Sequence, residues 1–362
     1  MPRNGYLLYD ASVEQIPPGE DQTIRAIVES IARTSDASLV KHHHGIRQQH
    51  AKGQGFLKGE LTVYDNLPDH LRQGMFAAAR TYPIIVRLST AFGDIRGDRI
   101  RVPRGMAIKV LGVDGAKALP EDASANQDFL LVNHKNYIAS AAAYSWLQRS
   151  FEFQPSTPDF ALRAIGFASR SLKTLCDSVG IAMPMALAGL ADAGNNILGE
   201  TYHSEAAIRF GAHVARISAA PASESVRELA GMPMHSDDSA LLNFVVAFFR
   251  DNAAEYELSA QLCTDLQRMP VEDTSIEWPE AVSPLQPIGR ISLPRQNADS
   301  PERRAYSDEI LSFNPWRCLA AHQPLGSIMR LRKEAYRKSS VFRHEKNGHL
   351  MIEPRDITEF PD

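Results

Sequence analysis

The sequence predicts an α+β protein in which helices flank one closed or nearly closed β-sheet. Two observations lead to this fold class. Short apolar runs bounded by Gly, Pro, Asp and Asn occur early in the chain and again after residue 200. A block with apolar residues at helical spacing separates these runs. Strands on both sides of a helical insertion indicate a single sheet and not two domains.

The elements are expected in the following order. Residues 20–35 have the pattern of an amphipathic helix, and a polar, histidine-rich connection follows. The first group of short strands is expected at 56–64, 83–90, 106–111 and 128–132. The helical block is expected at 138–151, 160–179 and 183–193. Strands return around 207–219, 240–250 and 289–293. We therefore expect an N-terminal arm over residues 1–45 and one domain over residues 46–362.

The composition is that of an ordinary globular protein. The chain has 362 residues, of which 44% are hydrophobic and 23% are charged, and its formal net charge is -4. This balance gives no reason to expect nucleic acid or an anionic membrane as a partner. The cysteines are far apart and form no CxxC motif, as expected for reduced thiols. Without a recognisable signal peptide or a transmembrane run of about 20 residues, a cytoplasmic location is expected.

The stretch from Arg332 to Arg343 carries two arginines and a tyrosine on one face of an expected helix between Pro324 and Gly348. Steps of four and seven residues place Arg332, Tyr336 and Arg343 in a narrow arc at about 3.6 residues per turn. A phenol beside a guanidinium can ionise, and tyrosinate is one of the axial ligands of haem iron. Arg343 lies about 10 Å farther along the axis, which fits the reach from iron to the porphyrin's carboxylates. Alone, the stretch also fits a basic, solvated helix face.

A second candidate group lies near the expected strands. His50 precedes a glycine-containing turn, and imidazole can move a proton between two oxygens near neutral pH. Arg87 and Ser89 project to the same side of an apolar strand, where an arginine needs an anion or a polar network. Asn126 stands at the start of another apolar strand, where its amide can donate to a bound oxygen species. Taken singly, His50 and Asn126 also fit a structural histidine and a turn residue.

Together these segments resemble the catalase superfamily over most of residues 45–345. That superfamily combines a V-x-HAKG-type segment, a VRFST-type strand, a PRG-FA turn, an N-x-x-x-FF strand and an R-x-x-x-Y helix. In the same order this chain has Gln49–Gly53, Val86–Thr90, Val102–Ala107, Asn126–Leu131 and Arg332-x-x-x-Tyr336. The resemblance implies a catalase-like antiparallel β-barrel with flanking helices around one buried haem b, within residues 46–362.

The resemblance also implies a role for each matching residue. Tyr336 is expected to be the proximal tyrosinate on ferric iron, with its basicity lowered by Arg332. His50 is expected to be the distal acid–base group, with its ring steadied by Ser89. Asn126 is expected to be the amide that orients a peroxide. The side chains expected to hold the haem propionates are Arg47, Arg87 and Arg343.

The chain departs from typical catalases in two respects. It ends soon after the expected haem helix, without the helical C-terminal domain that often binds a dinucleotide. The residue before the expected distal histidine is Gln49, where a small valine is usual. Segments 199–202, 313–316 and 322–326 look more like the short, catalase-related bacterial haem proteins. That group resembles the hydroperoxide-rearranging haem domain of corals.

The resemblance therefore implies a haem-dependent peroxidase or catalase-like oxidoreductase. Its substrate would be hydrogen peroxide or an organic hydroperoxide, including a lipid hydroperoxide, and a small organic reductant would complete the cycle. One alternative is a fatty-acid hydroperoxide isomerase, which needs no external reductant. Another is a haem-binding protein used for sensing or storage without turnover. The resemblance further implies a homo-oligomer and a part in the oxidative stress response.

Overall fold

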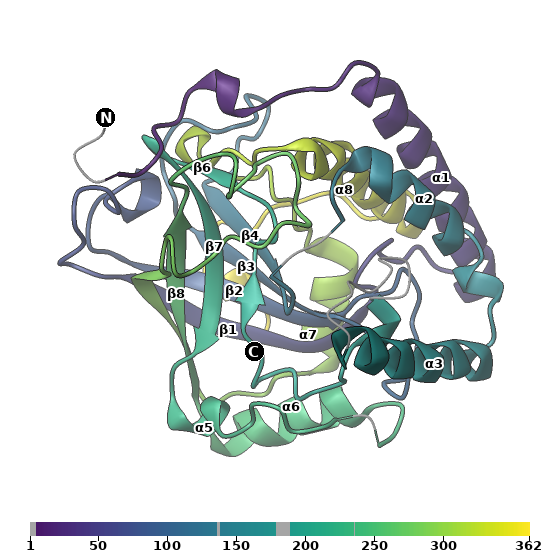
Figure 1. The fold of residues 1–362 in the computed structure, drawn as a ribbon. Helices are drawn as coiled ribbons and strands as arrows, with labels where there is room; N and C mark the ends of the chain where they lie inside the picture. Colours follow the sequence, from purple (N-terminus) through teal and green to yellow (C-terminus); the bar gives the residue numbers. More distant parts are fainter. Residues whose placement is uncertain (1–4, 136–137, 179–188, 235) are drawn as a thin grey trace.

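A closed antiparallel β-barrel forms the centre of the molecule (Figure 1). The computed structural model describes residues 5–135, 138–178, 189–234 and 236–362. The strands are β1 (Lys52–Val63), β2 (Thr81–Thr90), β3 (Arg104–Leu111), β4 (Asn126–Val132), β5 (Tyr202–His203), β6 (Ile208–Phe210), β7 (His213–Pro221), β8 (Ala254–Leu262) and β9 (Gln286–Leu293). They pair in the order β5-β4-β3-β2-β1-β9-β8-β7-β6, and a further β5–β7 pairing closes the ring. The expected α+β barrel is confirmed.

Helices cover the outside of this barrel. They are α1 (Glu20–His42), α2 (Ala141–Phe151), α3 (Asp159–Ser178), α5 (Glu224–Arg227), α6 (Ala240–Asp251), α7 (Pro301–Ala305) and α8 (Ser327–Asn347). In Figure 1, α1, α2 and α8 lie together on one side of the barrel, and α6 runs beneath it. Ile27 of α1, Tyr144 of α2 and Leu331 of α8 belong to one buried apolar cluster. This cluster fixes α8 against the other two helices.

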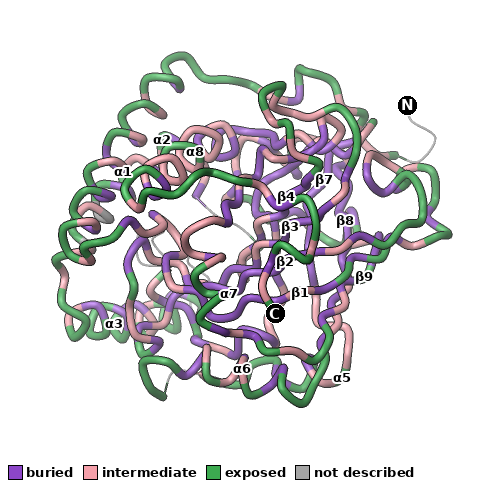
Figure 2. The backbone as a smooth tube through the Cα atoms, turned by 180° about the vertical axis from the view of Figure 1, so that it is seen from behind, coloured by how far each residue is buried: buried purple, intermediate pink, exposed green. Residues whose placement is uncertain are grey.

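The main core fills the interior of the barrel, as the buried central strands in Figure 2 show. Successive side chains of a strand point to opposite faces. In β2, Val86 and Leu88 belong to the interior cluster, whereas Arg87 and Ser89 take the other face. That outer face is also buried, because helices and loops cover it. The alternation of the strand therefore places the polar side chains of Arg87 and Ser89 on the outer face of the barrel, beneath the surrounding helices and loops.

The C-terminal segment, residues 349–362, lies across the outer face of β1–β4. Lys109 of β3 has a fully buried side chain whose Nζ lies 2.8 Å from Asp128 and 2.7 Å from Glu353. Lys58 of β1 pairs with Asp362 at 2.5 Å. A buried ammonium is tolerated only when carboxylates pair with it. These ion pairs therefore hold the end of the chain on the barrel.

Several expected elements differ from the structure. Residues 240–250, expected as a strand, form the helix α6, whose buried residues Ala240, Leu241, Val245 and Phe249 follow helical spacing. The strand of this region is β8, which the sequence patterns did not predict. The expected helix over 183–193 lies mostly outside the described residues. The last helix ends at Gly348, with φ 71°, as expected.

No helix in the described ranges is long and apolar enough to cross a bilayer.

Candidate functional site

His50 lies at the start of β1, against the ends of two neighbouring strands. Its Nδ1 is 3.0 Å from Oγ of Ser89 in β2. A Cβ atom at Gly105 of β3 would lie 2.6 Å from Nδ1, so only glycine allows β3 this close to the ring. Burial, and then the charge of Arg87, lower the pKa of His50 to about 3. The imidazole is therefore neutral at ordinary pH and able to accept a proton.

Three guanidinium groups converge on a short π-helix, Tyr306–Ile310, which directly follows α7. Arg47 donates to the Asp308 carboxylate at 2.9 Å and to the Leu311 carbonyl at 2.7 Å. Arg343 of α8 donates to the same Leu311 carbonyl at 3.0 Å and to the Asp308 carbonyl. Arg87 of β2 lies 3.5 Å from the Asp308 carboxylate. The structure thus brings together the three arginines singled out from the sequence.

This arginine cluster is short of negative charge. Among the described residues, Asp308 is the one carboxylate that forms ion pairs with it. Burial and repulsion from the neighbouring arginines lower the pKa of Arg87 to about 9 and that of Arg343 to about 8. The Nε of Arg87 is buried without a hydrogen-bond partner. The cluster therefore fits a ligand that brings further carboxylates, for which charge-assisted bonds are strongest.

Tyr336 and Arg332 face each other on α8. The Nη2 of Arg332 lies 3.1 Å from Tyr336 Oη, and its Cζ is 5.2 Å from the centre of the phenol ring. The segment before His50 also contacts α8, because the backbone amide of Gln48 donates to Ser339 Oγ at 3.4 Å. The charge of Arg332 also contributes to the low pKa of His50. The expected Arg-x-x-x-Tyr pair therefore lies on the α8 side of the group built around His50.

Tyr144 of α2 joins this site, although the sequence patterns did not single it out. Its phenol is buried and hydrogen-bonds to Gln49, the neighbour of His50. Burial, and then the proximity of Tyr336, raise the pKa of Tyr144 above its ordinary range. No motif marked this residue, because the apolar spacing of α2 gave it only a packing role.

The structure does not bring Asn126, the expected distal amide, to this group. Asn126 pairs with Leu111, while Gly105 lies at the opposite end of β3. Six residues separate these ends, or about 20 Å at about 3.3 Å per residue. The Asn126 amide instead donates to Glu353 at 3.2 Å and to the Pro354 carbonyl at 3.0 Å. It holds the C-terminal segment.

The amide at the His50 end of β4 is Asn133, directly after the strand. Its Oδ1 accepts a hydrogen bond from the Arg104 amide at 2.8 Å, and its Nδ2 donates to Asp192 at 3.2 Å. Arg104 precedes Gly105, the glycine that touches the His50 ring. The signal for this placement is the antiparallel β3–β4 pair, which puts the end of β4 beside the start of β3.

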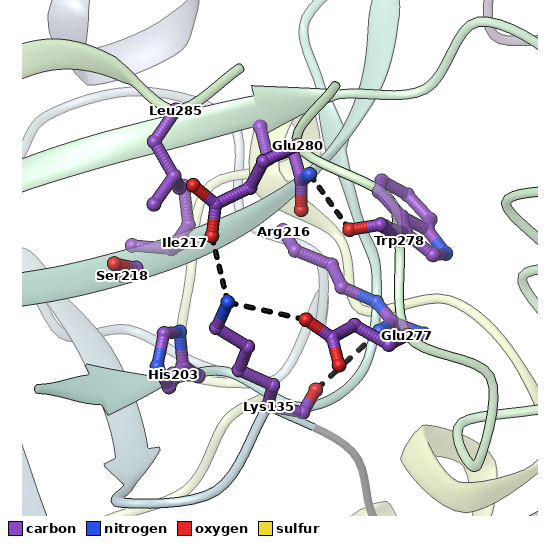
Figure 3. A pocket seen from close by; sticks show the side chains of 10 residues that line it. Lys135, His203, Arg216, Ile217, Ser218, Glu277, Trp278, Glu280 and Leu285 are labelled. Carbon is purple, nitrogen blue, oxygen red and sulfur yellow. Dashed lines mark hydrogen bonds and ion pairs between the residues drawn. The ribbon is translucent and has the colours of Figure 1, made fainter. Parts of the chain in front are cut away.

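A small polar pocket lies on another part of the barrel (Figure 3). Lys135 lies between Glu277, at 3.1 Å, and Glu280, at 2.7 Å. Arg216 stacks on the Trp278 ring at 4.6 Å, and its Nε and Nη2 are buried without partners. The lining also includes His203 and Ser218. No residue of the His50 group lines this pocket.

The described ranges hold no group of three or more His, Cys, Asp or Glu side chains that could bind a metal ion.

No family model matches this chain, and no curated protein matches it. Solved structures with a similar fold include a fungal catalase, catalase A from Saccharomyces cerevisiae and a bacterial catalase. Their TM-scores are 0.56, 0.57 and 0.56, at sequence identities of 16%, 17% and 14%. The alignments cover 85%, 85% and 83% of this chain, and 61%, 63% and 58% of those chains.

The chain therefore has a catalase-like fold. It spans about three fifths of the length of the catalases it matches, with alignments over 58% to 63% of their chains. At these identities the likeness establishes the architecture, and the chemistry has to be argued from the side chains.

Proposed function

We propose that this protein is a haem-dependent oxidoreductase of the peroxidase or catalase-like type. Its substrate is hydrogen peroxide or an organic hydroperoxide. The observation that carries the proposal is the cluster of Arg47, Arg87 and Arg343, whose positive charges are balanced by few carboxylates. The cluster lies next to a neutral His50 and an Arg332–Tyr336 pair. A set of this kind suits an anionic, iron-bearing ligand better than a small anion, because the Tyr336 phenol beside Arg332 can act as a donor to iron.

The side chains of the site fit a haem group. The Tyr336 phenol would be the donor to iron, and the Arg332 guanidinium lies 3.1 Å from its oxygen. The arginine cluster holds the two propionates and supplies the charge that balances them. When bound, the haem supplies the redox-active iron at which the peroxide bond is cleaved. The catalases of similar fold support this assignment at the level of the architecture.

His50 is the proton carrier in this proposal. With a pKa of about 3, it is neutral and can take the proton from one peroxide oxygen. It then gives that proton to the departing oxygen, which leaves as water or an alcohol. Ser89, 3.0 Å from Nδ1, fixes the ring for both transfers. Asn133 replaces Asn126 as the amide proposed to orient the peroxide.

The test of the haem site is the absorbance spectrum of the purified, haem-loaded protein and of its Tyr336→Phe variant. Loss or a clear shift of the ferric spectrum in the variant is expected, because the phenolate is removed from iron. Tyr9→Phe is the matched control, since Tyr9 stacks on Arg209 at 4.6 Å, away from the site. A haem spectrum unchanged in Tyr336→Phe would overturn the assignment.

The type of reaction is tested by turnover of the haem-loaded protein. Rapid oxidation of a phenolic dye by hydrogen peroxide is expected for a peroxidase. Loss of a conjugated-diene hydroperoxide without added reductant would instead identify the isomerase. Turnover of neither substrate, with haem bound, would contradict an enzymatic role and leave a haem-binding protein.

A further inference from the structure

Large apolar side chains project into solvent from the consecutive helices α2 and α3. Trp146 of α2 is 77% exposed, and Phe160, Phe167 and Leu175 of α3 are 72%, 70% and 60% exposed. Phe153, between the two helices, is 70% exposed. In Figure 1, α3 lies at the edge of the molecule, outside the barrel, and much of it is drawn as exposed in Figure 2. Single exposed apolar residues are ordinary, but a group of large ones marks an interaction surface.

The outer side of α3 is distinct from the side that packs on the protein. Leu162 is buried and packs with Ile100 and Val102. Phe160 and Phe167 are seven residues apart, nearly two turns at about 3.6 residues per turn, so they form a row along the helix. Among the described residues, neither phenylalanine belongs to a buried apolar cluster. The row is therefore free to contact something outside the chain.

An arginine follows three of these aromatic residues at the same spacing. The pairs are Trp146 and Arg149, Phe160 and Arg163, and Phe167 and Arg170. Residues three positions apart are neighbours on one helix face, so a row of guanidinium groups borders the aromatic rings. In α2 the two groups are in contact, because the Cζ atom of Arg149 lies 5.6 Å from the centre of the Trp146 ring.

The positive charge of this face is not balanced by the acids of the same segment. Those acids are engaged in other ion pairs, namely Glu152–Arg33, Asp159–Arg96 and Asp177–Lys173, at 2.7, 2.5 and 2.7 Å. Within the part of the chain that the structure describes, no carboxylate forms an ion pair with Arg149, Arg163 or Arg170. The whole chain has a formal net charge of -4, so this face is opposite in sign to the molecule. The overall balance gave no reason to expect an anionic membrane, but the local balance does.

We propose that this surface, the α2–α3 face, binds an anionic lipid membrane. The face is defined by the exposed residues Trp146, Phe153, Phe160, Phe167 and Leu175 and by the arginines Arg149, Arg163 and Arg170. The apolar side chains enter the boundary between headgroups and acyl chains, and the guanidinium groups pair with lipid phosphates. The helices lie on the membrane and do not cross it. This inference does not depend on the proposed haem function.

A second copy of this chain fits the face less well. In a two-fold dimer the same patch of both copies meets itself. The arginine rows would then face each other, and the acids of this segment are already engaged in ion pairs. Like charges across an interface cost affinity. Lipid phosphates supply the negative charge that a second copy lacks.

The charge requirement is tested by co-sedimentation of the protein with vesicles. We expect binding to vesicles of phosphatidylcholine mixed with phosphatidylglycerol, weaker binding at high salt, and little binding to phosphatidylcholine alone. Arg163→Gln should weaken binding to the mixed vesicles about fivefold, the usual effect of one basic residue near an anionic surface. Arg295→Gln is the matched control, because Arg295 is exposed in the loop after β9. Equal binding to both kinds of vesicle, binding to neither, or full binding of Arg163→Gln would overturn the proposal.

The apolar requirement is tested with the same mixed vesicles. Phe167→Ser should weaken binding about tenfold, and Leu175→Ser should weaken it less, because less apolar surface leaves water. Leu350→Ser is the matched control, because Leu350 is 75% exposed but lies outside the α2–α3 face. All three residues are exposed, so Tm should be unchanged, which separates lost binding from lost folding. A loss in Leu350→Ser equal to that in Phe167→Ser would contradict the assignment to this face.

Tryptophan fluorescence reports whether this face is the one that meets the lipid. The chain has three tryptophans, and Trp278 and Trp316 are buried, whereas Trp146 is exposed. Mixed vesicles should therefore shift the emission to shorter wavelength and protect it from a water-soluble quencher. Trp146→Phe should lose the shift and still sediment with the vesicles. Sedimentation of the natural protein without any shift would show that another surface binds.

The oligomeric state without lipid decides against the second copy. Analytical ultracentrifugation should give the same mass for the natural protein and for Phe167→Ser. A dimer that Phe167→Ser dissociates would assign the face to a second copy and overturn the lipid assignment. The absorbance spectrum of Tyr336→Phe tests the haem function alone, so either proposal can fail without the other.

Discussion

The position of the His50 ring depends on two neighbours that exchange no proton with the peroxide. Ser89 fixes Nδ1 from one side, and the missing side chain of Gly105 leaves room on the other. The ring is thus aimed by the packing of two strand ends and not by a partner on its own loop. Small changes at these neighbours should affect catalysis without altering the barrel.

Gly105→Ala tests this dependence. The new Cβ would lie 2.6 Å from His50 Nδ1 and must displace the ring. We expect peroxide-dependent dye oxidation to fall by about 100-fold, the usual scale of general acid–base catalysis. Haem binding, read from the absorbance spectrum, should be retained. Gly189→Ala is the control, because a Cβ there meets no atom of the described residues within 4 Å. Equal rates in both variants would contradict the role of the ring position.

The pH dependence of turnover offers a second test at this scale. A solvent-exposed histidine loses its basic form as pH falls through about 6.5. Burial and the charge of Arg87 lower the pKa of His50 to about 3, so its basic form persists well below that pH. The peroxide-dependent kcat/KM should therefore stay level from pH 8 down to pH 5. An acid limb centred near pH 6.5 would show that His50 is not the base or is not buried as described.

At the scale of the element, β4 decides which amide can reach the site. Asn126 begins the strand and Asn133 follows its end, so the two residues lie at opposite ends of β4. The motif alone could not distinguish the two asparagines, because a strand pattern does not tell which end of the strand lies near His50. The antiparallel pairing with β3 resolves the choice.

Paired variants of the two asparagines test this placement. Asn133→Ala should slow peroxide turnover, because the proposed orienting amide is lost. Asn126→Ala should leave turnover unchanged and lower stability by about 1–3 kcal/mol, since buried hydrogen-bond partners in the C-terminal segment lose their donor. Turnover is measured with the phenolic dye and stability by denaturant titration. Loss of turnover in Asn126→Ala alone would restore the original expectation.

Local patterns in the sequence predicted many residues of the candidate site and the strands β1–β4. The Arg332–Tyr336 pair depends on helix periodicity, and the Arg87–Ser89 pair depends on strand alternation, so both could be read directly. The run that became α6 could not, because a short apolar segment fits a buried strand and a buried helix equally well. Tyr144 escaped notice for a different reason. Its place in the site comes from neighbours distant in sequence, which no local pattern encodes.

At the scale of the whole molecule, the C-terminal segment completes the outer layer of the barrel. Phe360 is fully buried in the apolar cluster on β1 and β2. Glu353 binds Lys109 at 2.7 Å and Arg317 at 2.9 Å. Residues 349–362 thus cover this face of the catalase-like barrel. The arrangement as a homo-oligomer and the cytoplasmic location stay predictions.

Glu353→Gln should destabilise the whole protein. Breaking one partner of a buried ion pair costs about 3 kcal/mol, because Lys109 would keep an incompletely balanced charge. Nearby cations hold the pKa of Glu353 below its ordinary value despite burial, so its contribution is present above the unfolded pKa and is lost as pH falls. Denaturant unfolding at pH 7 and pH 4 should therefore show a larger difference at pH 7. The exposed Glu359→Gln serves as control, and an equal loss there would contradict this account.

The backbone at His50 also bears on how this chain can evolve. With a φ of 54°, the residue sits in a region that costs a side-chain-bearing residue about 1 kcal/mol or more, but costs glycine little. His50→Gly should therefore unfold at a higher temperature than His50→Ala, although both lack the imidazole. Stability and chemistry favour different residues at this one position. A lineage selected only for durability would drift to glycine here, so a retained histidine would record continued selection for the reaction.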